Sequence, residues 1–172
     1  LICLRSIERI FGVVEMTGLI IATGNSHKLT EFKSHFLGIE LHGLDDFANF
    51  VMPPETGDTF LDNAMIKAKA VHEFTGQIAL ADDSGLVVDA LNGAPGVRSA
   101  RFVEGSDRDR YLALLTAMKD KTKRSARFVA CLAVAGLPSD MPLPPDVYRQ
   151  DEIVYVHGRV DGVISDSPRG EN

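Results

Sequence analysis

The sequence lacks tryptophan and contains only two cysteines, Cys3 and Cys131. Two cysteines are too few for a disulfide framework, so a reduced, cytoplasmic setting fits the composition best. The sequence also lacks any apolar run near the roughly 18 residues that a membrane-spanning helix requires. The apolar N-terminal patches are interrupted by Arg5, Glu8 and Arg9, which makes a poor signal peptide. We therefore expect no membrane association and no secretion signal.

An excess of positive charge is missing as well. Lys and Arg number 18 against 24 Asp and Glu, which gives a formal net charge of −6. This balance argues against a broad nucleic-acid-binding surface, so we expect no nucleic-acid partner. A small phosphorylated ligand stays possible, because exposed charges are screened beyond about 8 Å and a few lysines can dominate one cleft.

The apolar content, in contrast, is sufficient for a real core. The 172 residues are 45% hydrophobic, which suits one domain or a two-lobed unit. The sequence does not begin with Met, and Met16 lies just before the first clear apolar run. We expect residues 1–15 to be an N-terminal extension and residues 16–172 to form the main domain.

The stretch around which the sequence is organised covers residues 79–102. An apolar run over residues 78–81 stops at Asp82, Asp83 and Ser84, and a second run follows at residues 86–88. Short apolar runs of this kind predict buried strands. Two carboxylates at the end of a buried strand are costly to desolvate unless a metal ion or a lysine meets them. The alternative is a turn that Asp83 or Ser84 caps.

A strand, a turn and a helix are expected near the N-terminus. Residues 19–22 (LIIA) predict a short strand, and the spacing of apolar residues over 29–37 predicts a helix. The turn between them, TGNSHK at residues 23–28, would aim free backbone N–H groups at an anion, and Lys28 adds a charge. The pattern is not a Walker A motif. An ordinary turn with Ser26 as the helix N-cap explains it equally well.

A second helix is expected from Thr59, which forms a capping box with Asp62, to about residue 74. Its apolar face would contain Phe60, Ala64, Ala68, Val71 and Phe74. Lys69 falls on the opposite side, whereas Lys67 falls on the core side, close to Asn63. An unpaired buried ammonium group is costly. Lys67 therefore either extends past the edge of the core or reaches an anion in the cleft of Asp82 and Asp83.

The second half of the sequence predicts a helix, three strands and a loop. A capping box of Ser106 and Asp109 opens a helix. The nearly continuous apolar run over residues 127–135 predicts a strand covered on both faces. The proline-rich residues 136–151 predict a surface loop. Residues 152–157 and 159–165 predict two strands joined near Gly158.

Three motifs stand in order along the chain: TGNSHK (23–28), ETGDTFLDNAMIKA (55–68) and ADDSGLVVDALNGAPGVRSARF (81–102). Together they closely resemble the bacterial branch of the non-canonical purine nucleoside triphosphate pyrophosphatases, also called the Ham1 or inosine triphosphatase family. The resemblance extends over about residues 18–172. It implies an α/β fold with a long twisted mixed sheet flanked by helices, two lobes around a central cleft, and a homodimer.

The resemblance also implies an activity and a site. Such proteins cleave ITP, dITP and XTP to the monophosphate and pyrophosphate with Mg²⁺, which cleanses the nucleotide pool. Glu55 and Asp83 would hold the Mg²⁺, and Asp83 would accept the proton of the attacking water. Lys67 would contact phosphate and Ser84 the substrate. The triphosphate-binding loop would comprise Thr23, Gly24, Asn25, Ser26, His27 and Lys28.

One departure from the family pattern concerns the C-terminal end. The family continues past the Pro168 and Gly170 pattern into an aromatic segment, a later Lys and a His-Arg pair, which recognise the base. Here the sequence ends at Asn172, before them. We expect the pyrophosphatase domain at 16–172 to be incomplete at this end, and such a chain to discriminate poorly between ITP and ATP and to be nearly inactive.

Two other functions are compatible with the residues. A nucleotide-binding module without catalysis would keep TGNSHK but would need neither Glu55 nor Asp83. A Mg²⁺-dependent phosphohydrolase of another class could act on a different nucleotide, although no Walker A or Asp-x-Asp-x-Thr pattern supports a specific rival. Pyrophosphate release from ITP separates these hypotheses.

Overall fold

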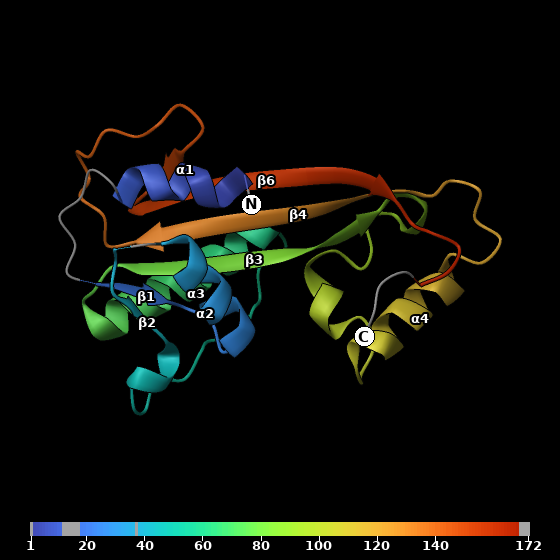
Figure 1. Ribbon diagram of the computed structural model, residues 1–172, viewed down its shortest axis with the longest axis horizontal. Coiled ribbons are helices and arrows are strands. Elements are labelled where there is room, and N and C mark those ends of the chain that lie inside the picture. The colour runs from blue at the N-terminus through green and yellow to red at the C-terminus, as the bar shows by residue number, and fades with distance from the viewer. Residues whose placement is uncertain (1, 12–17, 37, 169–172) are drawn as a thin grey trace. The chain divides into compact units, whose positions relative to one another are not determined.

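A computed structural model describes residues 2–11, 18–36 and 38–168 of the chain. A six-stranded mixed sheet has the order β2-β1-β3-β4-β6-β5, with β1 parallel to β2 and β3 and with β5 antiparallel to β6 (Figure 1). This confirms the α/β class with a mixed sheet flanked by helices. The strands are β1 (Leu19–Ile21), β2 (Leu41–His42), β3 (Ala79–Val88), β4 (Ser125–Ala135), β5 (Tyr148–Gln150) and β6 (Ile153–Val163). The helices are α1 (Ile2–Phe11), α2 (Ser26–His35), α3 (Phe60–Thr75) and α4 (Asp107–Ala117).

The chain divides into two compact units. The first comprises residues 1–83 and 131–158, and the second comprises residues 84–130 and 159–172. Strands β3, β4 and β6 each have residues in both units, so the chain passes from one unit to the other within each of these strands. The cleft between two lobes and the division at residues 15 and 16 stay predictions.

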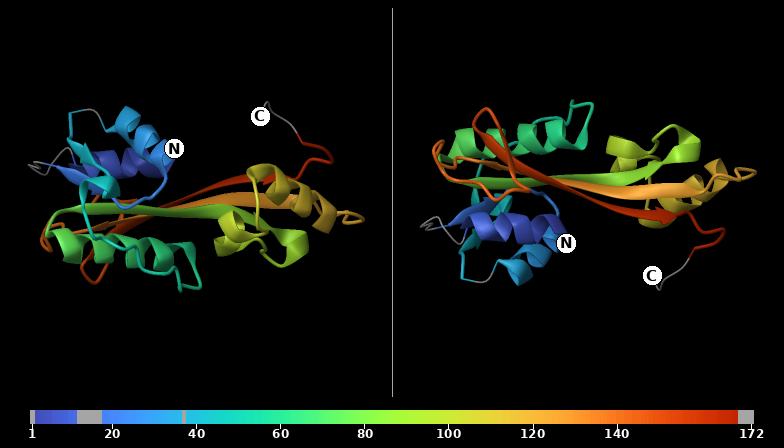
Figure 2. Two further views of the ribbon diagram at one scale, coloured as in Figure 1. Left: turned by 90° about the horizontal axis from the view of Figure 1, so that it is seen from below. Right: turned by 90° about the horizontal axis from the view of Figure 1, so that it is seen from above.

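In the first unit, helices cover both faces of the sheet. Helices α1 and α2 lie on one face and α3 lies on the other (Figure 2). All three residues of β1 are buried, as expected for a strand covered on both sides. Phe32 of α2 and Phe36, which directly follows the helix, are buried, and the ring of Phe36 lies 5.5 Å from that of Phe11 in α1. The predicted apolar face of α3 is confirmed for Phe60, Ala64, Ala68 and Val71.

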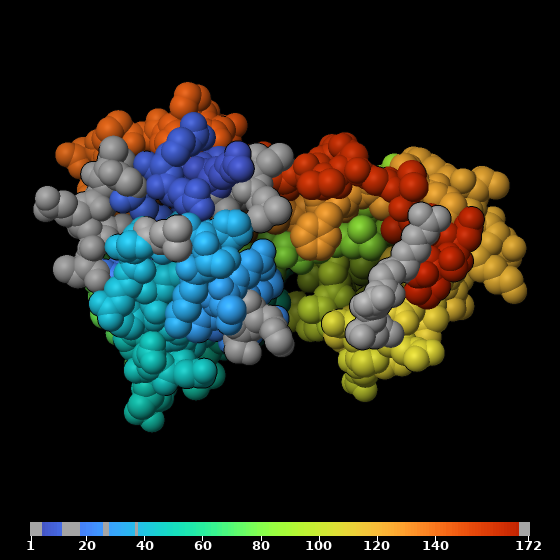
Figure 3. All heavy atoms as spheres, viewed as in Figure 1, coloured from blue at the N-terminus to red at the C-terminus, as the bar shows by residue number. Residues whose placement is uncertain are grey.

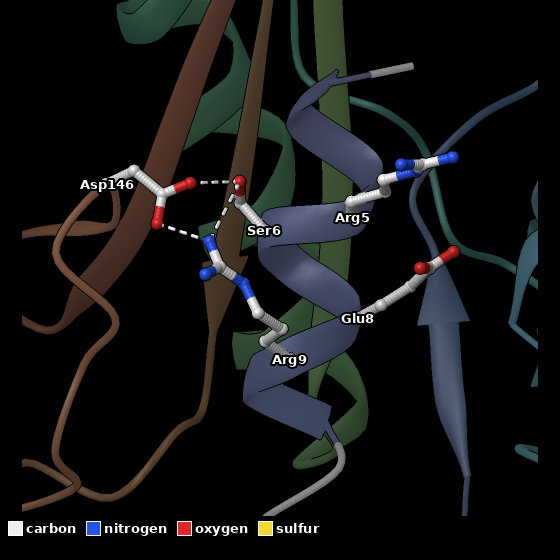
Figure 4. Close-up of a pocket in the computed structure, with 5 residues that line it drawn as sticks. All are labelled: Arg5, Ser6, Glu8, Arg9 and Asp146. Carbon is white, nitrogen blue, oxygen red and sulfur yellow. Dashed lines mark hydrogen bonds and ion pairs between the residues drawn. The ribbon is translucent and has the colours of Figure 1, made fainter.

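Helix α1 forms within the stretch for which the sequence predicts no structure of its own. Its Ile7 and Ile10 are fully buried. Ser6 and Arg9 bind the carboxylate of Asp146, which lies in the segment between β4 and β5, whereas Arg5 and Glu8 point to the other side of the helix (Figure 4). In the space-filling view the atoms of α1 lie beside the orange atoms of that segment (Figure 3). The helix is therefore packed and anchored to the first unit.

In the second unit, Val88, Met118 and Ala126 form a small core. Helix α4 begins at the predicted capping box, in which the Ser106 hydroxyl accepts the N–H of Asp109. Asp89 follows β3, and its carboxylate accepts hydrogen bonds from the side chains of Ser125 and Arg127 in β4. These polar contacts fix the end of β3 to β4 within this unit.

Some of the expectations about strands are wrong. Asp82, Asp83 and Ser84 neither end a strand nor form a turn, because β3 continues through them. Residues 152–165 do not form two strands, because β6 continues through Gly158. Pairing with a neighbouring strand overrides the local preference for a break in both cases, since glycine and aspartate can both adopt extended backbone. The short strand β5 interrupts the predicted loop over residues 136–151.

Two predicted burials are also wrong. Phe74 is 51% exposed, although its ring packs 5.2 Å from that of Phe50. Phe128 in β4 is 50% exposed, so of the predicted run over residues 127–135 only residues 131–135 are buried as expected. An apolar run does not reveal how far the covering layer extends. No helix in the described part of the chain is long and apolar enough to cross a membrane.

Candidate active site

The continuity of β3 determines the arrangement of the two adjacent aspartates. Consecutive residues of a strand point to opposite faces of the sheet. Asp82 accepts a hydrogen bond from Lys28 of α2, with 2.6 Å between Lys28 Nζ and Asp82 Oδ2. Asp83 accepts one from Lys67 of α3, with 3.1 Å between Lys67 Nζ and Asp83 Oδ1. Each aspartate is thus paired with a lysine from the helix on its own face.

Lys67 is the centre of a cluster on the α3 face. Its ammonium group also donates to Glu55, with 3.0 Å between Lys67 Nζ and Glu55 Oε1. The side chains of Lys67 and Asp83 are 11% and 12% exposed, and that of Glu55 is 25% exposed. Lys67 therefore does not extend past the core. It meets Asp83, as the second alternative expected, and bridges it to Glu55, whereas Asp82 pairs with Lys28.

Burial and charge act against each other in this cluster. Burial favours the neutral form and raises the pKa of Asp83 above its usual range, although the positive charge of Lys67 partly opposes the shift. Burial also acts to lower the pKa of Lys67, but the charge of Asp83 and the hydrogen bond to Glu55 outweigh it and keep the pKa raised. Lys67 is therefore a firmly charged group between two acidic partners.

Asn63 is a member of the cluster that the sequence analysis did not assign to the site. It lies one turn before Lys67 in α3, and none of its surface is exposed. Its side-chain Nδ2 lies 3.4 Å from Asp83 Oδ2, and its Oδ1 accepts the N–H of Gly57 at 2.8 Å. The signal was present in the sequence, because a second polar residue beside Lys67 on the apolar face of a helix also requires a buried partner.

The residues of the predicted phosphate loop lie between β1 and α2. The Thr23 hydroxyl accepts the N–H of Asn25, and the Asn25 side chain accepts the N–H of Lys28 at 3.4 Å. Because α2 begins at Ser26, Asn25 and not Ser26 occupies the N-cap position. Gly24 is exposed with open space around it. Lys28 is oriented by its contact with Asp82.

The structure adds little about the roles of three of the expected site residues. The side chains of Ser26 and His27 lie outside the described part of the structure. Ser84 follows Asp83 in β3 and is half-buried. The structure thus brings Glu55, Lys67 and Asp83 together on one face of β3, whereas Lys28 lies on the other.

The carboxylates of Glu55 and Asp83 fit a hard divalent cation whose remaining ligands come from the substrate. Among the described residues, no group of three or more His, Cys, Asp or Glu side chains could hold a metal ion. Glu55 and Asp83 offer carboxylate oxygens on either side of a single positive charge, the ammonium group of Lys67. Mg²⁺ is commonly held by one or two carboxylates together with substrate phosphates. The two carboxylates match that mode and not an all-protein cage.

Comparison with known families places this cluster in a wider context. The sequence model of the Ham1 family matches residues 19–172. The chain belongs to the Ham1 family. The matched range contains the 23–28 loop, Glu55, Lys67 and Asp83, and α1 precedes it. The resemblance noted from the three motifs is therefore confirmed.

Other members of the Ham1 family are similar over most of the chain. The dITP/XTP pyrophosphatase of Symbiobacterium thermophilum is 46% identical over 156 residues, which cover 88% of this chain and 72% of the relative. That of Thermus thermophilus is 44% identical over 158 residues, which cover 89% and 70%. The Ham1 protein of Coxiella burnetii superposes with a TM-score of 0.76 at 36% identity, over 91% of this chain and 77% of the other.

A second solved structure gives the same result. The Staphylococcus aureus Ham1 protein superposes with a TM-score of 0.75 at 34% identity, over 90% of this chain and 76% of the other. Similarity of fold at this level of identity supports the topology described above.

Proposed function

We propose that this Ham1-family chain hydrolyses non-canonical purine nucleoside triphosphates, namely dITP, XTP and ITP, to the monophosphate and pyrophosphate, with Mg²⁺ as cofactor. The observation that carries the proposal is the buried cluster in which Lys67 bridges Glu55 and Asp83. The curated relatives that are named dITP/XTP pyrophosphatases, at 46% and 44% identity, support the substrate class.

The charges of substrate and site explain why a metal is needed. A triphosphate carries about four negative charges at neutral pH, and the carboxylates of Glu55 and Asp83 would repel it. When bound, Mg²⁺ supplies charge neutralisation and polarises the phosphate oxygens. Lys67, whose single positive charge offsets part of the charge of the two carboxylates, supplies a positive charge close to the reacting phosphates. The 23–28 loop would supply the charge of Lys28, which pairs with Asp82 on the other face of β3, together with backbone N–H groups at the start of α2 that would bind phosphate oxygens.

Asp83 is the residue that we propose as the proton acceptor. In the reaction, water adds across the anhydride bond between the α- and β-phosphates, and pyrophosphate leaves. In the metal-free protein burial raises the pKa of Asp83, which favours acceptance of a proton by its carboxylate. Lys67 and Asn63 hold its two oxygens in a fixed direction, so the base is oriented before the substrate arrives.

The test is a single-turnover assay, with protein in excess over nucleotide so that slow hydrolysis is measurable. We expect pyrophosphate and the monophosphate from dITP and XTP, in amounts that depend on Mg²⁺. Release of inorganic phosphate in place of pyrophosphate would indicate a different phosphohydrolase. Saturable binding without any product would indicate a nucleotide-binding module and would overturn the proposal.

We further propose that the protein acts as a homodimer in the cytoplasm. The resemblance of its motifs to the bacterial enzymes supports the dimer, and the small number of cysteines supports a reducing compartment. Sedimentation at micromolar concentration tests the dimer, because a single species with the mass of one chain would contradict it.

A further inference from the structure

We propose that Asn63 is a positioning residue that sets the separation of the two site carboxylates, by tying the segment that carries Glu55 to Asp83. Asn63 connects two parts of the chain that meet only through folding, the segment before α3 and the strand β3. Its kinetic consequences rest on the function proposed above, but its structural consequence does not.

Both ends of the Asn63 side chain are used. Its Oδ1 accepts the backbone N–H of Gly57 at 2.8 Å, and its Nδ2 lies 3.4 Å from Asp83 Oδ2. The residue is fully buried, so water cannot replace either contact. Only an amide offers an acceptor and a donor at this length, since leucine offers neither and aspartate offers no donor.

Gly57 fits this role because it lies directly against α3. A Cβ atom at Gly57 would lie 2.4 Å from the Cβ of Asp62 and 2.8 Å from Asn63 Oδ1. No side chain fits there, so the backbone approaches the first turn of the helix closely. Thr59 is fixed to the same turn by its capping box with Asp62. The segment is thus attached to α3 at two points just after Glu55.

The contacts of Asp83 complete the arrangement. Lys67 binds its Oδ1 and Asn63 approaches its Oδ2, so the plane of the carboxylate is fixed from both sides. Both residues also contact the segment that carries Glu55. Lys67 binds the carboxylate of Glu55, and Asn63 binds the backbone N–H of Gly57. The contact of Lys67 with Glu55 depends on charge, whereas the contact of Asn63 with Gly57 depends on the shape and polarity of the amide.

The structural test is amide hydrogen exchange at Gly57, measured by NMR without metal or nucleotide. In the unsubstituted protein we expect this N–H to be protected. Asn63→Leu removes the acceptor at similar volume and should accelerate exchange at least tenfold, whereas Asn63→Asp keeps the acceptor and should preserve protection. Val71→Ala is the matched control, because it weakens the buried face of the same helix and should leave exchange at Gly57 unchanged. Unchanged exchange in Asn63→Leu would overturn the proposal.

The functional test is the Mg²⁺ dependence of single-turnover pyrophosphate release. Asn63→Leu should raise the half-maximal Mg²⁺ concentration about tenfold and lower the maximal rate, with little change in the half-saturating nucleotide concentration. Asn63→Ser, which fits the space, replaces the leucine variant if that variant does not fold. A variant with fast exchange at Gly57 and an unchanged Mg²⁺ dependence would refute the positioning role. Absence of turnover in the unsubstituted protein would refute the proposed function, while the exchange experiment would still decide the role of Asn63.

Discussion

Replacing Lys67 by methionine removes the positive charge from the centre of the site and keeps most of the volume of the side chain. Glu55 and Asp83 would then face each other without the ammonium group that now contacts both at 3.0 and 3.1 Å. We expect the Lys67→Met variant to be less stable than the unsubstituted protein without Mg²⁺ and to turn over more slowly with it. We also expect Mg²⁺ to stabilise the variant more than it stabilises the unsubstituted protein.

The magnitude follows from the geometry. At an effective dielectric constant near 20, a pair of unit charges at 3 Å attracts by roughly 5 kcal/mol, before desolvation is subtracted. Removal of one partner of a buried pair costs about 3–5 kcal/mol, because it leaves an uncompensated charge. Glu55 is a quarter exposed, which places the expected loss near the lower end, at about 3 kcal/mol. Loss of a charge-stabilising donor should also cost about 2–4 kcal/mol of transition-state stabilisation.

The assay is urea unfolding with and without Mg²⁺, combined with single-turnover pyrophosphate release. A cation that binds only the folded protein stabilises it in proportion to the logarithm of its concentration over its dissociation constant. Lys69→Met is the matched control, because Lys69 lies two residues along α3 and is 63% exposed, with only a 3.8 Å contact to Glu73. We expect that variant to change stability by less than about 0.5 kcal/mol.

Two results would refute this reasoning about Lys67. Equal losses in Lys67→Met and Lys69→Met would show that the bridge contributes nothing specific. A Lys67→Met variant that Mg²⁺ stabilises no more than the unsubstituted protein would show that Glu55 and Asp83 do not form a cation site together.

Three further predictions concern the acidic residues. Asp83→Asn should keep the fold and lower turnover by orders of magnitude, and single-turnover rates near the unsubstituted value at saturating Mg²⁺ would contradict its role. Glu55→Gln should shift the Mg²⁺ titration most, so an unchanged titration removes Glu55 from the metal site. Hydrogen bonds from the side chains of Ser125, which has the larger effect, and Arg127 lower the pKa of Asp89 to about 2, below its unfolded value near 3.9. Its contribution to stability is therefore present above about pH 4 and is lost as the pH falls towards 2, and acid unfolding of Asp89→Asn should lack this loss.

The sequence by itself determined the local features of the protein. The capping boxes of Thr59 and Ser106 predict the starts of α3 and α4 correctly, because their hydrogen bonds join residues three positions apart. The helical spacing of α3 likewise places Lys67 on the buried face. The three motifs identify the family, since they depend on residue type and order alone.

Only the tertiary structure decided how those residues meet. Whether β3 ends at Asp82 or continues depends on its neighbours in the sheet, which lie far away in the sequence. Its continuation places Asp82 and Asp83 on opposite faces and gives each its own lysine, an arrangement that no local pattern encodes. Asn63 shows the same limit, because the amide of Gly57 and the carboxylate of Asp83 become its partners only when a loop and a distant strand pack against one helix.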